Sequence, residues 1–383
     1  MLIAGGLYHE HCVVPAWSAK FGSGGRAAAA VSRLSPKSEL YTYSEQDQHA
    51  SITDYGVKIH LTKSESSIAF VYFHPLSTPF IEPRPNKLKQ LPSLQVSGSA
   101  VLRFGFLEGD AVVTASRAVY DPQTSTRPPA FRANGSEADE LAIVLNVNEV
   151  LMMSGMNDID AAAIAVMKND QASVLIVKDG IRGATLYQND THKVHIPAYK
   201  TKRVFKIGTG DVFSALFSYH WAEQRMGPLE SANLASKAVA QYCSDGTLPI
   251  VLQTPDKLLP VEGKQNTPVL VDGLSNTLGR RYVMEESCSR LRELGVDVIC
   301  PSIEEQYNSS AEISAIYLVA DIVNDEIREK CREAKEADVP VVVLCEAEDC
   351  IDRKCFDDPV FQITNDFTTS LYLVGWAAMQ TSS

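Results

Sequence analysis

A Gly-Thr-Gly-Asp run at residues 208–211 combines the residue types that phosphate chemistry needs. Its glycines let backbone N–H groups point at one spot, and an apolar stretch that predicts a helix follows directly. The positive end of that helix would add to the N–H groups in stabilising an anion. Asp211 could then accept the proton of an attacking hydroxyl. The run also suits a glycine-rich turn with a helix-capping aspartate, and on its own it leaves both interpretations open.

The elements that must position this run follow an α/β pattern from residue 100 onwards. Helix-like stretches alternate with short apolar runs that end at Gly, Asp, Asn or Lys, at residues 100–105, 118–122, 141–146 and 173–178. This alternation predicts a parallel sheet with helices on both faces. Ligands bind such sheets at the carboxyl ends of the strands, where these polar residues fall.

The first hundred residues predict further parts of the same layers. Residues 2–6 predict a short strand, residues 22–25 a flexible glycine loop, and residues 26–34 an alanine-rich helix. Short alternating runs between residues 57 and 73 suit a small antiparallel sheet more than a helix.

Five features, in the right order, resemble the ribokinase (PfkB) family of sugar and nucleoside kinases over about residues 1–250. They are the loop and helix 22–34, the pair Asp121-Pro122, the Asn-Val-Asn-Glu run 146–149, the turn 178–183 and the Gly-Thr-Gly-Asp run. The resemblance implies a three-layer α/β/α domain over residues 1–255. It also implies a β lid at about residues 38–100 that excludes water and pairs two subunits in a homodimer.

The resemblance implies a role for each matched position. Asp211 would be the general base, with an anion hole formed by Gly208, Thr209 and Gly210. ATP would contact Lys178, Gly180 and Gly183. Asn146 and Glu149 would organise Mg²⁺ and phosphate indirectly. The acceptor side would comprise Glu10, Gly22, Gly24, Gly25 and Arg26.

Three positions depart from the family pattern. Arg26 stands where many members have a substrate-binding asparagine, Glu10 or His11 stands where the pattern has an aspartate, and residues 205–206 (Phe-Lys) replace an Asp-Thr pair. A guanidinium suits phosphate or carboxylate, so Arg26 predicts a substrate that already carries an anion, such as a nucleotide or a sugar phosphate. The alternative for Arg26 is a structural salt bridge.

A second, smaller Rossmann-like α/β domain is predicted over residues 268–383, after a linker at residues 256–267. It faintly resembles nucleoside 2-deoxyribosyltransferases. That resemblance implies Asp272 and either Glu326 or Glu329 as candidates for glycosyl chemistry. A non-catalytic domain for assembly or ligand sensing is the alternative.

Composition limits the partners. The 383 residues include 47 acidic and 35 basic side chains, and the net charge of −12 disfavours general nucleic-acid binding. No apolar run approaches the roughly 20 residues of a membrane span, and the first residues lack signal-peptide features, so we expect a cytosolic protein.

Two groups of metal-ligating residue types have other interpretations. Cys345, Cys350 and Cys355 lack the paired spacing of zinc sites, and we expect thiols rather than a metal site or disulfides. His9 and His11 flank Glu10 without an evident third ligand, which favours a polar wall of the substrate pocket.

Together these features predict an ATP- and Mg²⁺-dependent phosphotransferase. Its acceptor would be a hydroxyl of a sugar, a nucleoside or an anionic nucleotide-like molecule. One alternative is a non-catalytic nucleotide-sensing or assembly protein on the same fold. Another is a bifunctional enzyme whose second domain cleaves glycosyl bonds.

Overall fold

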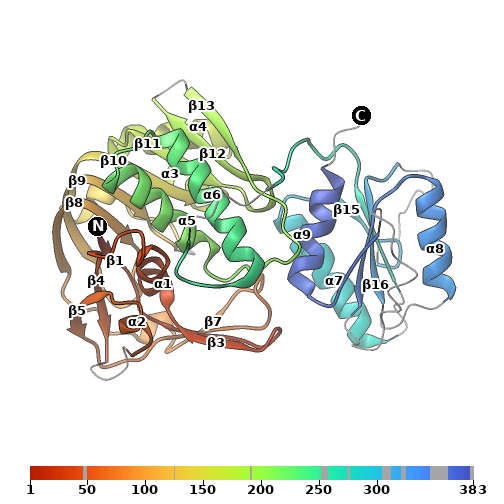
Figure 1. Cartoon of the computed structure of the whole chain (residues 1–383), viewed down its shortest axis with the longest axis horizontal. Coiled ribbons are helices and arrows are strands. Elements are labelled where there is room, and N and C mark those ends of the chain that lie inside the picture. The colour runs from red at the N-terminus through yellow and green to blue at the C-terminus, as the bar shows by residue number, and fades with distance from the viewer. Residues whose placement is uncertain are drawn as a thin grey trace. The chain divides into compact units, whose positions relative to one another are not determined.

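The computed structural model describes residues 1–45, 50–124, 126–189, 192–251, 258–273, 277–303, 312–320, 325–345 and 361–379. The chain divides into two compact units (Figure 1). The first comprises Met1–Tyr199 and Phe205–Leu258, and the second comprises Lys200–Val204 and Leu259–Ser383.

The larger sheet of the first unit is parallel over most of its width. Within the described ranges it has nine strands in the order β13-β12-β11-β10-β9-β8-β1-β4-β5. All neighbours from β5 to β11 are parallel, and β12 and β13 add an antiparallel edge. The strands are β1 (Leu2–Ala4), β4 (Glu39–Ser44), β5 (Lys58–Lys63), β8 (Leu94–Phe104), β9 (Ala111–Asp121), β10 (Glu137–Asn146), β11 (Val174–Lys178), β12 (Gly183–Gln188) and β13 (His192–Pro197).

Helices cover both faces of this sheet, which confirms the predicted α/β layers. Successive strand residues point to opposite faces, and both faces are apolar, as at Ile143 and Val144 of β10. One core joins α1, α2, α5 and α6 to one face, and another joins α3 and α4 to the other. The helices are α1 (Gly22–Val31), α2 (Ala50–Thr53), α3 (Val147–Ser154), α4 (Ile159–Asp170), α5 (Thr209–Ser218) and α6 (Pro228–Asp245). Short helical turns are η1 (Pro85–Lys87), η2 (Phe131–Asn134), η3 (Gly180–Arg182) and η4 (Tyr219–Glu223).

A separate four-stranded sheet, called the lid sheet below after the predicted lid, does not have the predicted bounds. Its strands are β2 (His9–Cys12), β3 (Trp17–Lys20), β6 (Ala69–Tyr72) and β7 (Phe80–Glu82), in the order β3-β2-β6-β7. The predicted range 38–100 is wrong at both ends, because β4, β5 and β8 belong to the large sheet and β2 and β3 precede the range. Backbone pairing over about sixty residues, as from Glu10 to Phe70, leaves no local sequence signal.

The glycine loop predicted at residues 22–25 is instead the first turn of α1. Gly24 donates its backbone N–H to Gly6 O at 3.0 Å, and a Cβ at Gly24 would collide with the backbone of Gly5. The glycines therefore let this helix approach the loop after β1 closely, rather than making it flexible.

The described part of the second unit contains a five-stranded parallel sheet in the order β15-β14-β16-β17-β18. In Figure 1, α7 and α9 lie on one face of this sheet and α8 on the other, where Cys331 and Ala334 join the core of β16 and β17. The elements are β14 (Val269–Gly273), α7 (Leu278–Glu293), β15 (Val298–Ile299), β16 (Ala315–Ala320), α8 (Asp325–Glu336), β17 (Val341–Cys345), β18 (Phe361–Thr364) and α9 (Phe367–Ala378).

Among the cysteines that the structure describes, one differs from expectation. Cys345, at the end of β17, is disulfide-bonded, which corrects the expectation of thiols there. Free thiols are found at Cys12, Cys243, Cys288, Cys300 and Cys331. Cys350 and Cys355 lie outside the described residues.

The length and hydropathy of the helices were compared with those of a membrane-spanning segment. Among the helices that the structure describes, none is by itself long and apolar enough to cross a membrane. Only α3 and α4 taken together, bent by 62°, reach that length and composition.

Candidate active site

Strand register brings three polar residues to one edge of the large sheet. Asn146 at the end of β10 pairs with Lys178 at the end of β11, and Asp121 ends β9 opposite Phe104. Lys178 Nζ lies 2.8 Å from Asp121 Oδ2, which also accepts from Ser214 Oγ at 2.7 Å. Burial lowers the pKa of Lys178, but Asp121 and Glu149 outweigh that effect, so the ammonium is held in its charged form.

The Gly-Thr-Gly-Asp run forms the beginning of α5. Gly208 precedes the helix with φ +77°, a conformation that favours glycine. Lys206 Nζ donates to Thr209 Oγ1 at 2.8 Å, and an added Cβ at Gly210 would lie 3.5 Å from Lys178 Nζ. Two lysine side chains thus flank the amino-terminal end of the helix, which is a suitable environment for a polyphosphate, although burial lowers the pKa of Lys206.

Asp211, in the first turn of α5, faces a cavity of about 560 Å³. Glu10, Gly22 and Gln123 line the same cavity. Aromatic and aliphatic side chains from the lid sheet and from two loops form the apolar part of its wall: Tyr8, Phe70, Tyr72, Ile81, Phe106 and Leu107. The amino-terminal end of α5 and a partly apolar cavity therefore meet at Asp211.

Arg26 was predicted to bind an anionic group of the substrate, but its side chain does not line this cavity. Its side chain is fully buried, and its guanidinium binds Glu10 bidentately (Nη1–Oε1 3.0 Å, Nη2–Oε2 2.6 Å) and Asp211 Oδ2 at 2.9 Å. Burial lowers the pKa of Arg26, but Glu10, Tyr242 and Asp211 outweigh it and raise the pKa well above the ordinary value. The alternative of a structural salt bridge holds for Arg26.

Glu149 and Asn146 form a capping box at the start of α3. Asn146 Oδ1 accepts from Glu149 N at 2.9 Å, and Glu149 Oε2 accepts from Asn146 N at 2.8 Å. Thr124 N donates to Glu149 Oε1 at 3.1 Å. Burial, and next the charge of Asp121, raises the pKa of Glu149 to about 6.

The residues around this box fit a magnesium ion held through water. Magnesium prefers oxygen ligands and keeps several waters. Glu149, with both oxygens bound to backbone N–H groups, lies within electrostatic reach of Asp121, whose Oδ1 is buried without a partner. Within the described part of the chain, no group of three or more His, Cys, Asp or Glu could bind a metal directly.

Of the glycines assigned to ligand sites, Gly22, Gly208 and Gly210 line the cavity, and others have structural roles. Gly183 has φ +101°, and a Cβ there would collide with Ile196 O across the β12–β13 pair. Gly180 has φ +52° and begins η3. A Cβ at Gly25 would lie 2.8 Å from Leu7 Cδ1. These positions require glycine for backbone geometry and packing.

Residues 133–247 match the family model described as pfkB family carbohydrate kinase. The predicted resemblance to the PfkB family is confirmed over this segment. The PfkB-matching segment contains the Asn146–Glu149 box, Lys178 and residues 208–211, but neither Glu10 nor Arg26.

Individual relatives cover parts of the chain. A 5-dehydro-2-deoxygluconokinase of Lacticaseibacillus casei is 32% identical over 95 residues, which are 24% of this chain. The chain spans 28% of the length of that curated relative. Among solved structures, ribokinase of Arabidopsis thaliana with ribose and ATP is 16% identical, with a TM-score of 0.48 over 65% of this chain and 95% of that one. Ribokinase of Thermotoga maritima is 17% identical, with a TM-score of 0.44 over 62% and 91%.

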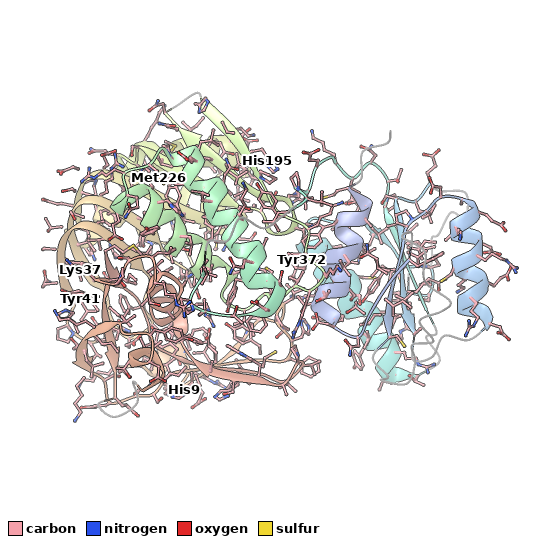
Figure 2. The ribbon with its side chains drawn as sticks, in the orientation of Figure 1. His9, Lys37, Tyr41, His195, Met226 and Tyr372 are labelled. Atoms are coloured by element: carbon pink, nitrogen blue, oxygen red, sulfur yellow. The ribbon has the colours of Figure 1, made fainter. Side chains whose placement is uncertain are left out.

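Reasoning from the sequence missed several residues of the site. Gln123 and Thr124 contact Asp211 and Glu149, directly after the Asp121-Pro122 pair that marked this loop. Tyr242 reaches Arg26 from α6, where nothing in the sequence distinguishes it from core residues. His9, labelled in Figure 2, stacks with His11 on the lid sheet with ring centroids 6.2 Å apart, and only Glu10 between them lines the cavity.

Of the candidates in the second unit, Asp272 and Glu329 have different ion-pair partners. Asp272, at the end of β14, pairs with Lys330 at 2.6 Å. Glu329 is exposed on α8 and pairs with Arg332. The side chain of Glu326 lies outside the described residues. A glycosyl-transfer role for these residues stays a prediction.

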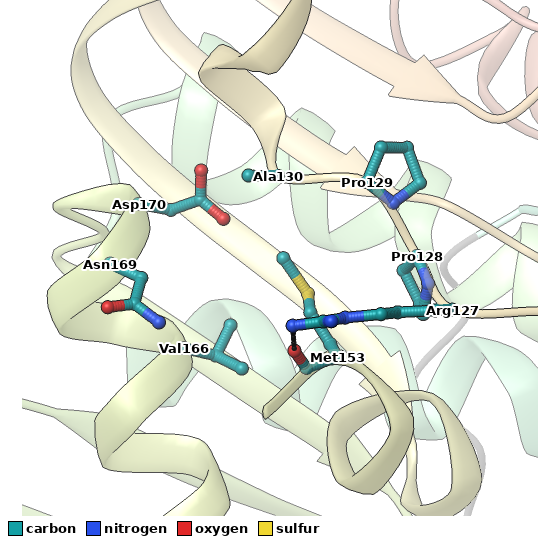
Figure 3. A pocket seen from close by; sticks show the side chains of 8 residues that line it. All are labelled: Arg127, Pro128, Pro129, Ala130, Met153, Val166, Asn169 and Asp170. Carbon is teal, nitrogen blue, oxygen red and sulfur yellow. Dashed lines mark hydrogen bonds between the residues drawn. The ribbon is translucent and has the colours of Figure 1, made fainter. Parts of the chain in front are cut away.

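A second cavity, of about 330 Å³, lies beside α3 and α4 (Figure 3). Arg127 crosses it to donate to Met153 O at 3.3 Å, and the carboxylate of Asp170 points toward Ala130. Asp170 is fully buried and accepts from the backbone N–H of Arg132 at 3.5 Å, so it holds the turn η2. None of the predicted site residues lines this cavity; its lining is Arg127, Pro128, Pro129, Ala130, Met153, Val166, Asn169 and Asp170.

Proposed function

We propose that this protein is an ATP-dependent phosphotransferase that phosphorylates a hydroxyl of a small sugar- or nucleoside-like acceptor. The observation that carries the proposal is the position of Asp211. It lies in the first turn of α5, behind Gly208 and Gly210, and faces a cavity that an acceptor could fill. A base and an anion-binding helix end are thereby within reach of the same ligand.

The γ-phosphate of ATP would lie at the amino-terminal end of α5, near Lys178 and Lys206. Bound Mg²⁺, organised by Asn146 and Glu149 through water, would neutralise phosphate charge. Asp211 would take the hydroxyl proton, and the backbone N–H groups of residues 208–210 would stabilise the charge that develops. The match of residues 133–247 to carbohydrate kinases supports a carbohydrate-like acceptor.

An anionic acceptor is no longer favoured. Arg26 was the residue that predicted it, and its guanidinium already binds two carboxylates and has no exposed surface. We therefore propose that the acceptor is a neutral molecule with a free hydroxyl group. A homodimer and a cytosolic location stay predictions.

A specific observation also supports the non-catalytic alternative. Both oxygens of Asp211 already accept hydrogen bonds, from Arg26 and from Gln123. A protein that binds ATP without transferring phosphate could have its aspartate occupied by hydrogen bonds from the protein in this way.

Turnover and binding assays separate the two functions. We would measure ADP formation from ATP and Mg²⁺ with sugars, sugar acids, nucleosides and nucleoside monophosphates, beside calorimetric ATP binding. Acceptor-dependent ADP formation, greater with neutral acceptors than with monophosphates, is expected. ATP binding without turnover on any acceptor would establish the alternative instead, and the absence of both would contradict the two proposals together.

A further inference from the structure

The two oxygens of Asp211 have unlike partners. Oδ2 faces Arg26, whose residue has 0% exposed surface. Oδ1 accepts from Gln123 Nε2 at 2.5 Å, and Gln123 is an exposed residue that lines the cavity. A ligand in the cavity could displace the amide of Gln123, whereas the buried guanidinium is out of its reach.

Packing and hydrogen bonds hold the guanidinium of Arg26 in place. Its Nε donates to Tyr242 Oη at 3.1 Å, and that hydroxyl donates to Ile207 O at 3.0 Å. On the other side the arginine lies against Gly208, where any Cβ would collide with it. The network ties α1, β2 and the beginning of α5 together.

The charges of this network also matter for the acceptor. One guanidinium faces the two carboxyl groups of Glu10 and Asp211, so acidic side chains outnumber basic ones in this group next to the cavity. A phosphate or carboxylate on the acceptor would be repelled from this wall, whereas a hydroxyl could donate to it.

We propose that Arg26 is the positioning residue of the general base: it fixes Asp211 through Oδ2 and leaves Oδ1, covered by Gln123 when no acceptor is bound, to take the hydroxyl proton. The inference rests on the proposed function. In the transfer step the acceptor oxygen forms a bond to the γ-phosphorus as the bond to the β,γ-bridging oxygen breaks. The hydroxyl proton passes to Asp211 Oδ1, and ADP leaves.

The test uses the full-length protein with ATP, Mg²⁺ and the best acceptor of the panel. Arg26→Gln keeps hydrogen-bonding groups without the charge, and we expect kcat to fall by about 100-fold with the KM for ATP unchanged, because a base that is misplaced loses most of its contribution. Arg26→Lys should restore part of kcat. Gln123→Ala should lower the KM for the acceptor by roughly 2- to 10-fold, the equivalent of one hydrogen bond that need no longer be displaced.

Arg103→Gln is the matched control for removing a buried arginine. Arg103 is also buried, and it pairs with Asp110 at 2.7 Å. This variant should lose stability without the selective loss of kcat. If Arg26→Gln fails to fold, Tyr242→Phe, which removes the hydroxyl that joins Arg26 Nε to Ile207 O, should lower kcat in the same selective manner.

The outcomes separate the inference from the proposed function. If Asp211→Asn is inactive while Arg26→Gln and Tyr242→Phe keep the wild-type kcat, the positioning role is wrong and the phosphotransferase stands. A higher acceptor KM in Gln123→Ala would likewise show that Gln123 binds the acceptor instead of covering the base. Wild-type turnover by Asp211→Asn, or an inactive wild-type protein, would overturn the proposed function itself.

Discussion

At the scale of single residues, Lys178 and Asp121 form an ion pair in which the carboxylate is fully buried. Asp121 is fully buried, and its Oδ1 has no partner, so it depends on Lys178 and Ser214 for compensation. Removing one partner of a buried ion pair lowers the free energy of unfolding by more than a surface ion pair adds to it, because the remaining charge stays desolvated.

Lys178→Met should therefore lower the free energy of unfolding by about 3–5 kcal/mol. Lys193→Met is the control, because Lys193 and Asp160 form a pair that is half exposed and should contribute less than about 1 kcal/mol. Urea unfolding followed by circular dichroism measures both. A loss for Lys178→Met no larger than that of the control would contradict the account of this pair.

Glu149 predicts a pH dependence of metal binding. Burial raises its pKa to about 6, with Asp121 adding to the effect and Lys178 opposing it. Because the pKa of this carboxyl is higher in the folded chain than in the unfolded chain, its protonation stabilises the fold at pH values below the pKa of the unfolded chain. This stabilisation is lost as the pH rises through about 6. The charge that would organise Mg²⁺ appears over the same interval.

We accordingly expect Mg²⁺ affinity in the presence of ATP to rise between about pH 5 and pH 7. Glu149→Gln should bind Mg²⁺ more weakly at neutral pH and should flatten that rise. Calorimetric Mg²⁺ titration at a series of pH values measures it. An equally steep rise in the variant would assign the titration to another group.

At the scale of elements, the beginning of α5 tolerates a side chain at one glycine and not at the other. Gly208 has φ +77° and lies against Arg26, whereas a Cβ at Gly210 would meet its nearest neighbour, Lys178 Nζ, at 3.5 Å. Gly208→Ala should lower the free energy of unfolding by about 2–5 kcal/mol, from the left-handed backbone and the overpacking together. Gly210→Ala should change it by less than about 1 kcal/mol. Thermal unfolding compares the two, and equal losses would contradict this geometry.

The elements also show how far the sequence can predict the site. The polar residues that end β9, β10 and β11 were predictable, because parallel strands place their carboxyl ends at one edge. The lid sheet was not, because its two halves join through β2 and β6, which pair across about sixty residues. The direction of the Arg26 side chain was equally hidden, since it depends on Glu10, Asp211 and Tyr242 from three other elements.

At the scale of the whole molecule, the two units have cores of their own, and the candidate site belongs to the first. ATP at about 100 times its dissociation constant should stabilise the unit that binds it by about 2.7 kcal/mol. We expect calorimetric scans to show an ATP-dependent rise in the unfolding temperature of the first unit. Separate expression of residues 259–383, the second unit without Lys200–Val204, assigns the transitions. A shift with ATP in that fragment would place a nucleotide site in the second unit.

The most direct test of the central claim is the turnover of Asp211→Asn. With the general base removed, acceptor-dependent ADP formation should fall by about 100- to 10,000-fold, while calorimetric ATP affinity stays within about threefold of wild type. Turnover retained within a factor of about ten would contradict the assignment of Asp211 as the base.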